Sequence, residues 1–213
     1  MLVGSGSGST VGVSYTQTTF SQLYNVGIAN FSVGIQLNNT HDAAFSNFSI
    51  RGCKVGIATS KTACNQNVFS NFGIEECATA VNWANGSDTV VFENGLVQGN
   101  YGKGIVAVDC NACTIQGTHF ENSALKGPAV IIASTGSACC NLVIGNRFTG
   151  PGGLVPDIAI TGGAGNVLIN NRAMSGGIAI SPSAHGTVLL ANTSWPKLFN
   201  TSKDTKVISS TWP

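Results

Sequence analysis

One short sequence occurs twice in this chain, at residues 45–50 (FSNFSI) and at residues 69–74 (FSNFGI). A related segment at residues 23–28 (LYNVGI) precedes the first copy by 22 residues. The 24-residue shift pairs Phe45 with Phe69, Asn47 with Asn71, Phe48 with Phe72, Ile50 with Ile74 and Cys53 with Cys77. A period in the low twenties with almost no strong helix former predicts a repeat architecture.

A short apolar pattern carries the repeat along the rest of the chain. A small residue is followed by a β-branched one, at Ile35, Ile57, Val81, Ile105, Val130, Ile158 and Ile178, with spacings of 22, 24, 24, 25, 28 and 20 residues. A second pattern, an apolar pair that closes on Asn, recurs at 91–94, 143–146, 168–171 and 189–192. Together these patterns predict seven clear repeats and a partial eighth.

Within one repeat the apolar residues alternate with a period of two, which is typical of β-strands. Phe45, Phe48, Ile50 and Ile57 are therefore expected to point inward. Asn47 breaks the alternation, and this favours a one-residue bend in the left-handed region, which Asn tolerates. We predict an all-β solenoid of about seven to eight rungs with three short strands each. The β-helix is expected at 17–195, after a Gly/Ser-rich start at 1–16 and before an irregular tail at 196–213.

Composition excludes several classes of protein. Charged residues make up 9% of the 213 residues against a usual quarter, yet hydrophobic residues reach 43%, so disorder does not explain the low charge. The formal net charge of +1 provides no basic footprint for nucleic acid. No apolar run approaches the 18 or more residues of a membrane span. The start lacks an apolar run flanked by Arg or Lys, so no signal peptide is visible.

The seven cysteines do not predict a metal site. Cys110 and Cys113 lack a second close pair, and Cys139 is adjacent to Cys140, which is poor geometry for joint chelation. We interpret the cysteines as a ladder of small buried thiols rather than a disulfide framework. Six Asn-x-Ser/Thr sequons are interpreted as coincidental in so Asn-rich a chain, at Asn30, Asn38, Asn47, Asn85, Asn192 and Asn200.

A three-strand rung with a recurring Asn bend and stacked Phe, Ile and Val resembles the right-handed parallel β-helix of the pectate-lyase-like superfamily, over residues 23–195. The polar, charge-poor texture is most similar to its bacteriophage tailspikes and tail fibres. The resemblance implies binding of bacterial surface polysaccharide, a homotrimer, no cofactor, and a place in the virion tail after assembly in the host cytoplasm.

The catalytic motifs of the superfamily's enzymes do not carry over. Residues 184–186 (AHG) come nearest to a polygalacturonase His motif, but no Asp pair accompanies them, so His185 is interpreted as a loop residue. The residues after the inward β-branched positions should point outward, and they include no acid, base or metal ligand. They are Gln36, Ala58, Asn82, Val106, Ile131, Ala159 and Ala179. Because an exposed apolar column is expected to be covered, Ala58, Val106, Ile131, Ala159 and Ala179 should be buried between chains of a parallel trimer.

The charges concentrate in the bend before each inward β-branched residue. We expect a ridge that binds saccharide through Arg51, Lys54, Glu75, Tyr101 and Lys103. If the chain is an enzyme, Glu76 and Glu121, two rungs or roughly 10 Å apart, are the candidate catalytic carboxylates. Glu93 on the intervening rung is a third. A solvated ladder of alternating charge is the alternative interpretation of this ridge.

Three function classes therefore stay open. The first is a receptor-binding segment of a phage spike without catalysis, which the scarcity of carboxylates favours. The second is a polysaccharide depolymerase, either a hydrolase or a lyase. The third is a secreted adhesin, which needs a signal sequence that is not visible here. Neither end shows a capping helix or a trimerising module, so we expect a piece of a longer protein.

Overall fold

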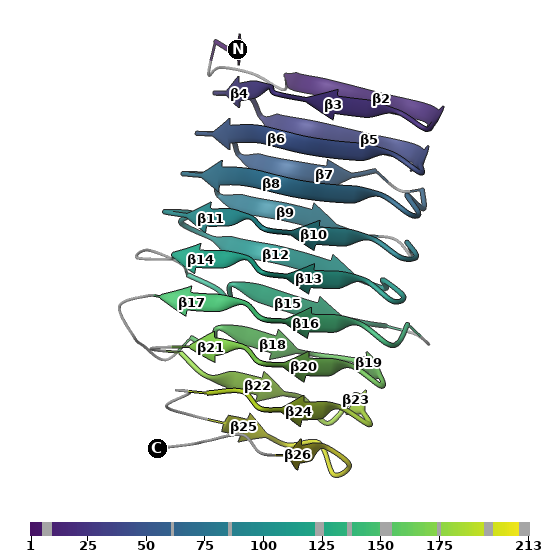
Figure 1. Ribbon diagram of the computed structural model, residues 1–213, viewed down its shortest axis with the longest axis vertical. Helices are drawn as coiled ribbons and strands as arrows, with labels where there is room; N and C mark the ends of the chain where they lie inside the picture. The colour runs from purple at the N-terminus through teal and green to yellow at the C-terminus, as the bar shows by residue number, and fades with distance from the viewer. Residues whose placement is uncertain are drawn as a thin grey trace.

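The computed structural model describes residues 1–5, 10–60, 62–84, 87–121, 126–135, 138–149, 155–173, 176–193 and 198–208, and they form only β-strands, turns and bends. The strands stack in parallel into a right-handed β-helix of about eight turns, with the N-terminus at one end of the stack and the C-terminus at the other (Figure 1). The predicted fold class is confirmed. The described residues form no helix with the length and hydropathy that a membrane crossing needs.

One side of the coil is a nine-stranded parallel sheet, which lies at the back in Figure 1. It contains β2 (Val11–Thr19), β5 (Val33–His41), β7 (Val55–Thr59), β9 (Thr79–Trp83), β12 (Lys103–Val108), β15 (Val130–Ala133), β18 (Ile158–Ile160), β22 (Ile178–Ile180) and β25 (Leu198–Asn200).

The other side is a 15-stranded sheet that a bend in every rung divides into two columns. The pre-bend column contains β3 (Gln22–Tyr24), the first halves of β6 (Ala44–Arg51) and β8 (Val68–Glu75), β10 (Val91–Glu93), β13 (Thr114–Gln116), β16 (Leu142–Ile144), β20 (Val167–Ile169), β24 (Val188–Leu190) and β26 (Lys206–Ile208). The post-bend column contains β1 (Leu2–Val3), β4 (Gly27–Ala29), the second halves of β6 and β8, β11 (Leu96–Gln98), β14 (His119–Glu121), β17 (Arg147–Thr149) and β21 (Arg172–Ala173). A small ladder joins β19 (Gly163–Ala164) to β23 (Ala184–His185).

The bend between the two columns confirms the predicted role of Asn47. Its φ is 52°, and φ is also positive at the equivalent residue of each of the seven other rungs whose bend the structure describes. These residues are Asn25, Asn71, Asn94, Gly117, Gly145, Asn170 and Ala191. Asn and Gly adopt this conformation at little cost, which explains why they occupy most of the bends.

The core follows the predicted register. The inward β-branched residues of the nine-stranded sheet pair in one line from Ile35 to Ile178 and are fully buried. Phe45, Phe69 and Phe92 stack with ring centroids 4.6 and 4.9 Å apart. Phe48 and Phe72 stack at 5.8 Å and are each 3% exposed, so the predicted aromatic stack is confirmed.

The thiols of Cys53 and Cys77 are buried in the next bend, as predicted, and each lies near a carbonyl oxygen two residues earlier in the chain. The contact with Cys53, reinforced by burial, raises the pKa of the Cys77 thiol. The prediction of a ladder of buried thiols was wrong for the later bends, however, since Cys140 is exposed. Cys110 and Cys113 form a disulfide, because both side chains of this bend point inward toward each other.

A ladder of buried Asn side chains replaces the aromatic stack in the C-terminal half, and the sequence analysis did not foresee it. Asn146, Asn171 and Asn192 are at most 1% exposed and follow the bend at the position that Phe48 and Phe72 occupy earlier. The amide oxygen of Asn171 accepts hydrogen bonds from the backbone N–H and side-chain Nδ2 of Asn146, at 3.1 and 3.0 Å. Asn171 Nδ2 donates to the Val143 carbonyl at 2.8 Å and to Asn192 Oδ1 at 3.0 Å.

The stack extends beyond the predicted limits of 17–195 at both ends. Strand β1 pairs with β4, and β2 begins at Val11 and pairs with β5, inside the segment expected to be a Gly/Ser-rich start. Strands β25 and β26 pair with β22 and β24, inside the expected irregular tail. Pairing with a neighbouring rung satisfies the backbone of these end strands even though their sequences lose the repeat.

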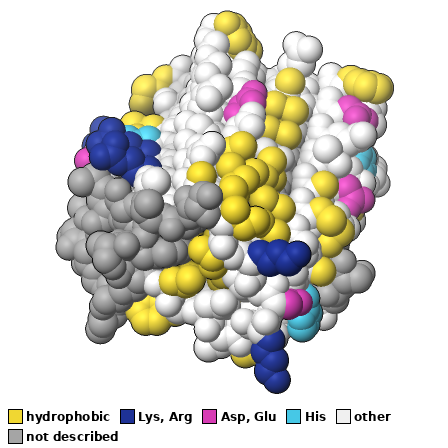
Figure 2. All heavy atoms as spheres, turned by 60° about the horizontal axis from the view of Figure 1, so that its bottom comes forward, with side chains coloured by type: hydrophobic (Ala, Val, Ile, Leu, Met, Phe, Trp, Pro, Cys, Tyr) yellow, Lys and Arg dark blue, Asp and Glu magenta, His cyan; other side chains and the backbone are white. Residues whose placement is uncertain are grey.

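Two outward faces are apolar, one of them unforeseen. The predicted column of the nine-stranded sheet lies in register. Val106 and Ala159, however, are only 8% and 7% exposed in the single chain, so a partner chain would bury little more of their surface. The second face is wider and covers the pre-bend column. Figure 2 shows hydrophobic side chains gathered there, over β16, β20 and β24, whose outward residues are partly exposed. They are Leu142, Ile144, Val167, Ile169, Val188 and Leu190.

Candidate functional site

Polar and charged side chains line the outside of the post-bend column. The parallel register places Arg51, Glu75, Gln98, Glu121 and Thr149 in one line across five successive strands, which we name the outer row. Neighbouring strands lie about 4.8 Å apart, so the outer row offers a hydrogen-bonding group at every step along the stack. Alternation along each strand directs these residues outward because the intervening ones, such as Ile74 and Phe120, are buried.

The remaining predicted ridge residues lie in the bend that leads from the post-bend column into the nine-stranded sheet. Lys54 and Lys103 are exposed, and Tyr101 is 49% exposed. Backbone hydrogen bonds stack this bend as they stack the strands: Tyr101 N–H donates to the Cys77 carbonyl and Lys103 N–H to the Ala78 carbonyl. The structure therefore brings the predicted saccharide-binding residues to one edge of the coil.

Glu76 lies in the predicted bend but does not line up with Glu121. It occupies the bend with a φ of 53°, one residue after the outer row, so Glu75 rather than Glu76 lines up with Glu121 two strands away. Arg51 holds Glu76 in a two-pronged ion pair, with Nε–Oε2 and Nη2–Oε1 distances of 3.0 and 2.6 Å. Hydrogen bonding from Arg51 lowers the pKa of the Glu76 carboxyl. A carboxyl kept ionised in this way is unsuited to protonate a leaving group.

Glu93 is not brought to the other candidate carboxylates. It lies on β10 in the pre-bend column, where its register partners are Ser70 and Gln116. Gln116 Nε2 donates to Glu93 Oε2 at 2.7 Å. The bend at Asn94 separates this position from the outer row, because the chain turns there from one column to the next. The proposed partnership of Glu93 with Glu121 is therefore wrong in geometry.

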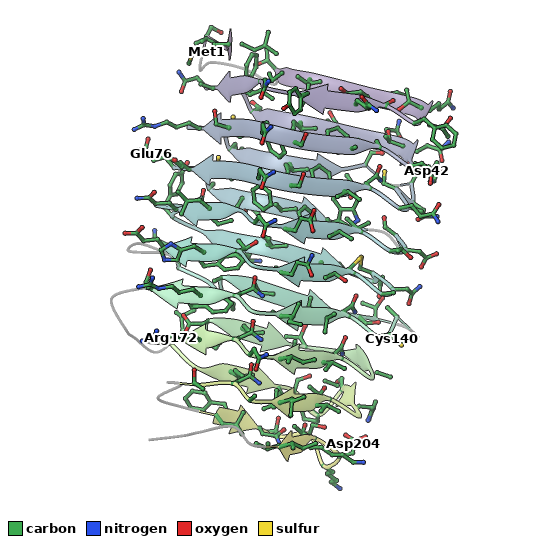
Figure 3. All side chains as sticks on the ribbon, in the orientation of Figure 1. Met1, Asp42, Glu76, Cys140, Arg172 and Asp204 are labelled. Atoms are coloured by element: carbon green, nitrogen blue, oxygen red, sulfur yellow. A yellow bond between two sulfur atoms is a disulfide. The ribbon has the colours of Figure 1, made fainter. Side chains whose placement is uncertain are left out.

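The outer row has a second row beside it that the sequence analysis did not identify. His119, Arg147 and Arg172 are register partners on β14, β17 and β21, and we name them the basic row. Both arginines are exposed. Figure 3 shows Arg172 on the same lateral side of the stack as Glu76, opposite Asp42 and Cys140. The 28-residue step from the His119–Phe120 pair to the Arg147–Phe148 pair is the one sequence signal that points to this alignment.

One further carboxyl lies in the bend that leads from β17 into the nine-stranded sheet. Asp157 immediately precedes β18 and accepts backbone hydrogen bonds from Gly176 and Gly177, at 2.8 and 3.2 Å. Burial raises the pKa of Asp157. Among the residues that the structure describes, no group of three or more His, Cys, Asp or Glu side chains is arranged to hold a metal ion. His185 lies on β23 with Nδ1 3.8 Å from Oδ2 of Asp204.

No protein-family profile and no curated protein sequence matches this chain. Its fold is nevertheless similar to solved structures. The DFA-IIIase of Arthrobacter chlorophenolicus without its lid superposes with a TM-score of 0.78 at 15% identity, over 94% of this chain and 55% of the other. The periplasmic alginate epimerase AlgG gives 0.73 at 12% identity, over 90% of this chain and 50% of the other.

The Streptococcus pneumoniae surface protein and adhesin PfbA gives a TM-score of 0.53 at 11% identity, over 95% of this chain and 67% of that protein. At such low identities the likeness establishes the fold alone. This chain spans about half the length of the first two structures, 55% and 50% of them.

Proposed function

We propose that this chain is a polysaccharide-binding segment of a parallel β-helix, which holds the polymer along the outer row and the adjoining bend. The observation that carries the proposal is the register itself. Arg51, Gln98 and Glu121 repeat hydrogen-bonding groups at one-strand intervals on one exposed edge, as a polymer of repeating sugars requires. Two proteins that share the fold are named for alginate and for adhesion, which supports a saccharide-related role.

The shape of the edge also supports sugar binding. Tyr101 presents an aromatic face on which a sugar ring can stack. Gly73 faces outward beside Glu75, and a side-chain carbon there would meet only Glu75 Oε1, at 3.9 Å. The backbone at Gly73 is therefore an open, flat place where a sugar ring can approach between neighbouring polar side chains.

We propose binding without catalysis for this segment. Glu76 forms an ion pair with Arg51, and Glu93 lies in the pre-bend column, away from the other candidate carboxylates. Glu75 and Glu121 stand two strands apart, about 10 Å between backbones, which is at the upper limit for the two carboxyls of an inverting glycosidase. A polysaccharide depolymerase that uses this pair is the alternative. More specifically, we propose that the segment belongs to a phage tailspike or tail fibre on the virion. A secreted adhesin is the alternative.

Replacing Tyr101 with alanine should weaken polysaccharide binding about three- to tenfold, because an aromatic contact contributes about 0.7–1.4 kcal/mol beyond the area it buries. The measurement is binding of the purified chain to an array of bacterial capsular polysaccharides and lipopolysaccharide O-chains. Tyr24, which is 61% exposed on β3, provides the matched control, and Tyr24→Ala should leave binding unchanged. Equal losses for both variants, or no binding to any polymer, would contradict the proposal.

The same polymers decide between binding and cleavage. We expect the unmodified chain to release no new reducing ends from any polymer that it binds. Release that disappears in the single variants Glu75→Gln and Glu121→Gln, but persists in Glu76→Gln and Glu93→Gln, would establish the depolymerase instead.

We also propose that the chain assembles as a homotrimer, and the apolar face over β16, β20 and β24 is the better candidate for the contact. Two adjacent rows of branched side chains lie there, whereas the nine-stranded sheet offers one row of mostly small ones. Ile169→Asp should therefore release monomers in sedimentation velocity, because it places like charges together near the axis. Release by Ile131→Asp alone would select the nine-stranded sheet, and a monomeric unmodified chain at micromolar concentration would refute the trimer.

A further inference from the structure

The two arginines of the basic row are cations that form no ion pair among the described residues. His119, Arg147 and Arg172 occupy the same position on three successive strands, so their backbones lie about 4.8 Å apart from one strand to the next. Glu121, the nearest acidic residue on these strands, pairs in register with Thr149 and not with Arg147.

The alignment of the two arginines does not stabilise the folded chain. Like charges directly opposite each other on neighbouring strands are destabilising. The chain has only three arginines among its 213 residues, and two of them are placed in this unfavourable register. The connections from these strands to the nine-stranded sheet contain one acidic residue, Asp157, whose carboxyl accepts backbone hydrogen bonds from Gly176 and Gly177 and, among the described residues, forms no ion pair with an arginine. A bound anion would remove the repulsion that the protein leaves uncompensated.

The N-terminal half of the same column is different. There Arg51 is neutralised by Glu76, and Glu75 adds a further negative charge. In the register position of the basic row these rungs carry Ser49, Gly73 and Leu96, which are uncharged. At this register position, basic side chains are therefore found only on β14, β17 and β21 among the described strands.

We infer that the basic row binds the anionic groups of an acidic polysaccharide, and that Arg147 and Arg172 each bind one carboxylate of the sugar chain. The inference rests on the proposed polysaccharide function and specifies its ligand class. Guanidinium groups suit this role because their fork of N–H donors matches a carboxylate in two parallel hydrogen bonds. The outer row runs beside the basic row, so Gln98, Glu121 and Thr149 are placed to bind hydroxyl groups of the same polymer.

His119 is positioned for the same ligand. Its Nε2 lies 2.9 Å from Thr149 Oγ1, a contact between the two neighbouring strands that fixes the plane of the ring. A ring held in this way extends the line of polar side chains by one rung beyond Arg147.

The test uses polygalacturonate, alginate and hyaluronan, each beside its carboxyl-reduced neutral form. The unmodified chain should bind at least one acidic polymer about tenfold or more tightly than the reduced form. The double variant Arg147→Gln/Arg172→Gln should lose about tenfold or more in affinity for the acidic polymer and keep its affinity for the reduced one. It should melt no lower than the unmodified chain, because the change removes a like-charge contact.

Two matched variants sharpen the result. Lys206→Gln removes an exposed cation on β26 in the pre-bend column, outside the proposed site, and it should change acidic-polymer affinity by less than about twofold. Arg147→Lys/Arg172→Lys keeps both charges but loses the planar forks, so its affinity should fall between the unmodified chain and the Gln variant. If the double Gln variant fails to fold, this Lys variant still tests the inference.

The outcomes distinguish failure of this inference from failure of the proposed polysaccharide function. Binding to neutral polysaccharides with no preference for the acidic forms would overturn this inference and leave the proposed function standing. Binding to no saccharide would overturn both. Tighter binding to a single-stranded DNA oligonucleotide than to any acidic polysaccharide would assign the basic row to nucleic acid, and unchanged binding by the double Gln variant would remove the basic row from the site.

Discussion

Replacing Phe69 with alanine should lower the free energy of unfolding by about 3–5 kcal/mol, as expected for truncation of a fully buried aromatic side chain. Phe69 is 0% exposed and lies at the centre of the aromatic core. Its ring stacks on Phe45 and Phe92 and meets the Trp83 ring edge-on at 5.4 Å. The rungs above and below hold these neighbours in place through the sheet, so they cannot collapse into the cavity.

Chemical denaturation followed by circular dichroism measures this loss. Phe72→Ala, one bend further along the rung, should cost a similar amount, because its ring fills the space over Gly95. Phe20, which is 79% exposed, provides the control, and Phe20→Ala should change stability by no more than about 0.5 kcal/mol. A Phe69→Ala cost below about 1 kcal/mol would show that the rung register described here does not form the core.

Replacing Asn171 with alanine should lower the free energy of unfolding by about 2–6 kcal/mol. The change removes the amide that accepts from the Asn146 backbone and donates to the Val143 carbonyl, so at least two buried backbone groups lose a partner. Each such group costs about 1–3 kcal/mol when it is left unsatisfied. Asn192, the next amide of the ladder, also loses its donor from Asn171.

The same denaturation experiment measures this loss. Asn82→Ala is the control, because Asn82 faces solvent on the nine-stranded sheet and should contribute no more than about 0.5 kcal/mol. Asn171→Leu should also be strongly destabilising, since it fills the volume but cannot satisfy the neighbouring backbone. A leucine variant as stable as the unmodified chain would show that the ladder adds no net stability.

The core was predictable because its residues repeat with the chain. Phe45 and Phe69, or Ile35 and Ile57, recur at the spacing of one rung, and a one-residue error of register would turn each of them toward solvent. The bend at Asn47 was predictable for a related reason, since Asn between two inward residues needs a backbone conformation that few other residues adopt.

The Asn ladder was missed because polar residues at inward positions contradict the apolar pattern on which the register was based. Only the structure shows that Asn146 and Asn171 satisfy each other across rungs. Cys110 and Cys113 were likewise read as separate thiols, since the sequence does not show that one bend turns both inward.

The sequence predicted which side of the coil carries the candidate site, but not how its residues line up. Arg51, Glu75 and Glu121 were placed correctly along one side because they follow inward residues of the repeat. The expected alignment of Glu76 with Glu121 was wrong because Glu76 occupies the bend itself, where the strand alternation stops, whereas Glu121 ends strand β14. The basic row was missed because the step from His119 to Arg147 is 28 residues, which hides the alignment that the shorter repeats reveal.

The most direct test of the account is a nuclear magnetic resonance titration of the isotope-labelled chain with an oligosaccharide fragment of a polymer that it binds on the array. We predict that the largest shift changes fall on backbone amides of the post-bend column and its following bend, around Gln98, Tyr101 and Glu121. Shift changes confined to the nine-stranded sheet or to β16, β20 and β24, or no changes at saturating fragment, would contradict the claim that this edge binds polysaccharide.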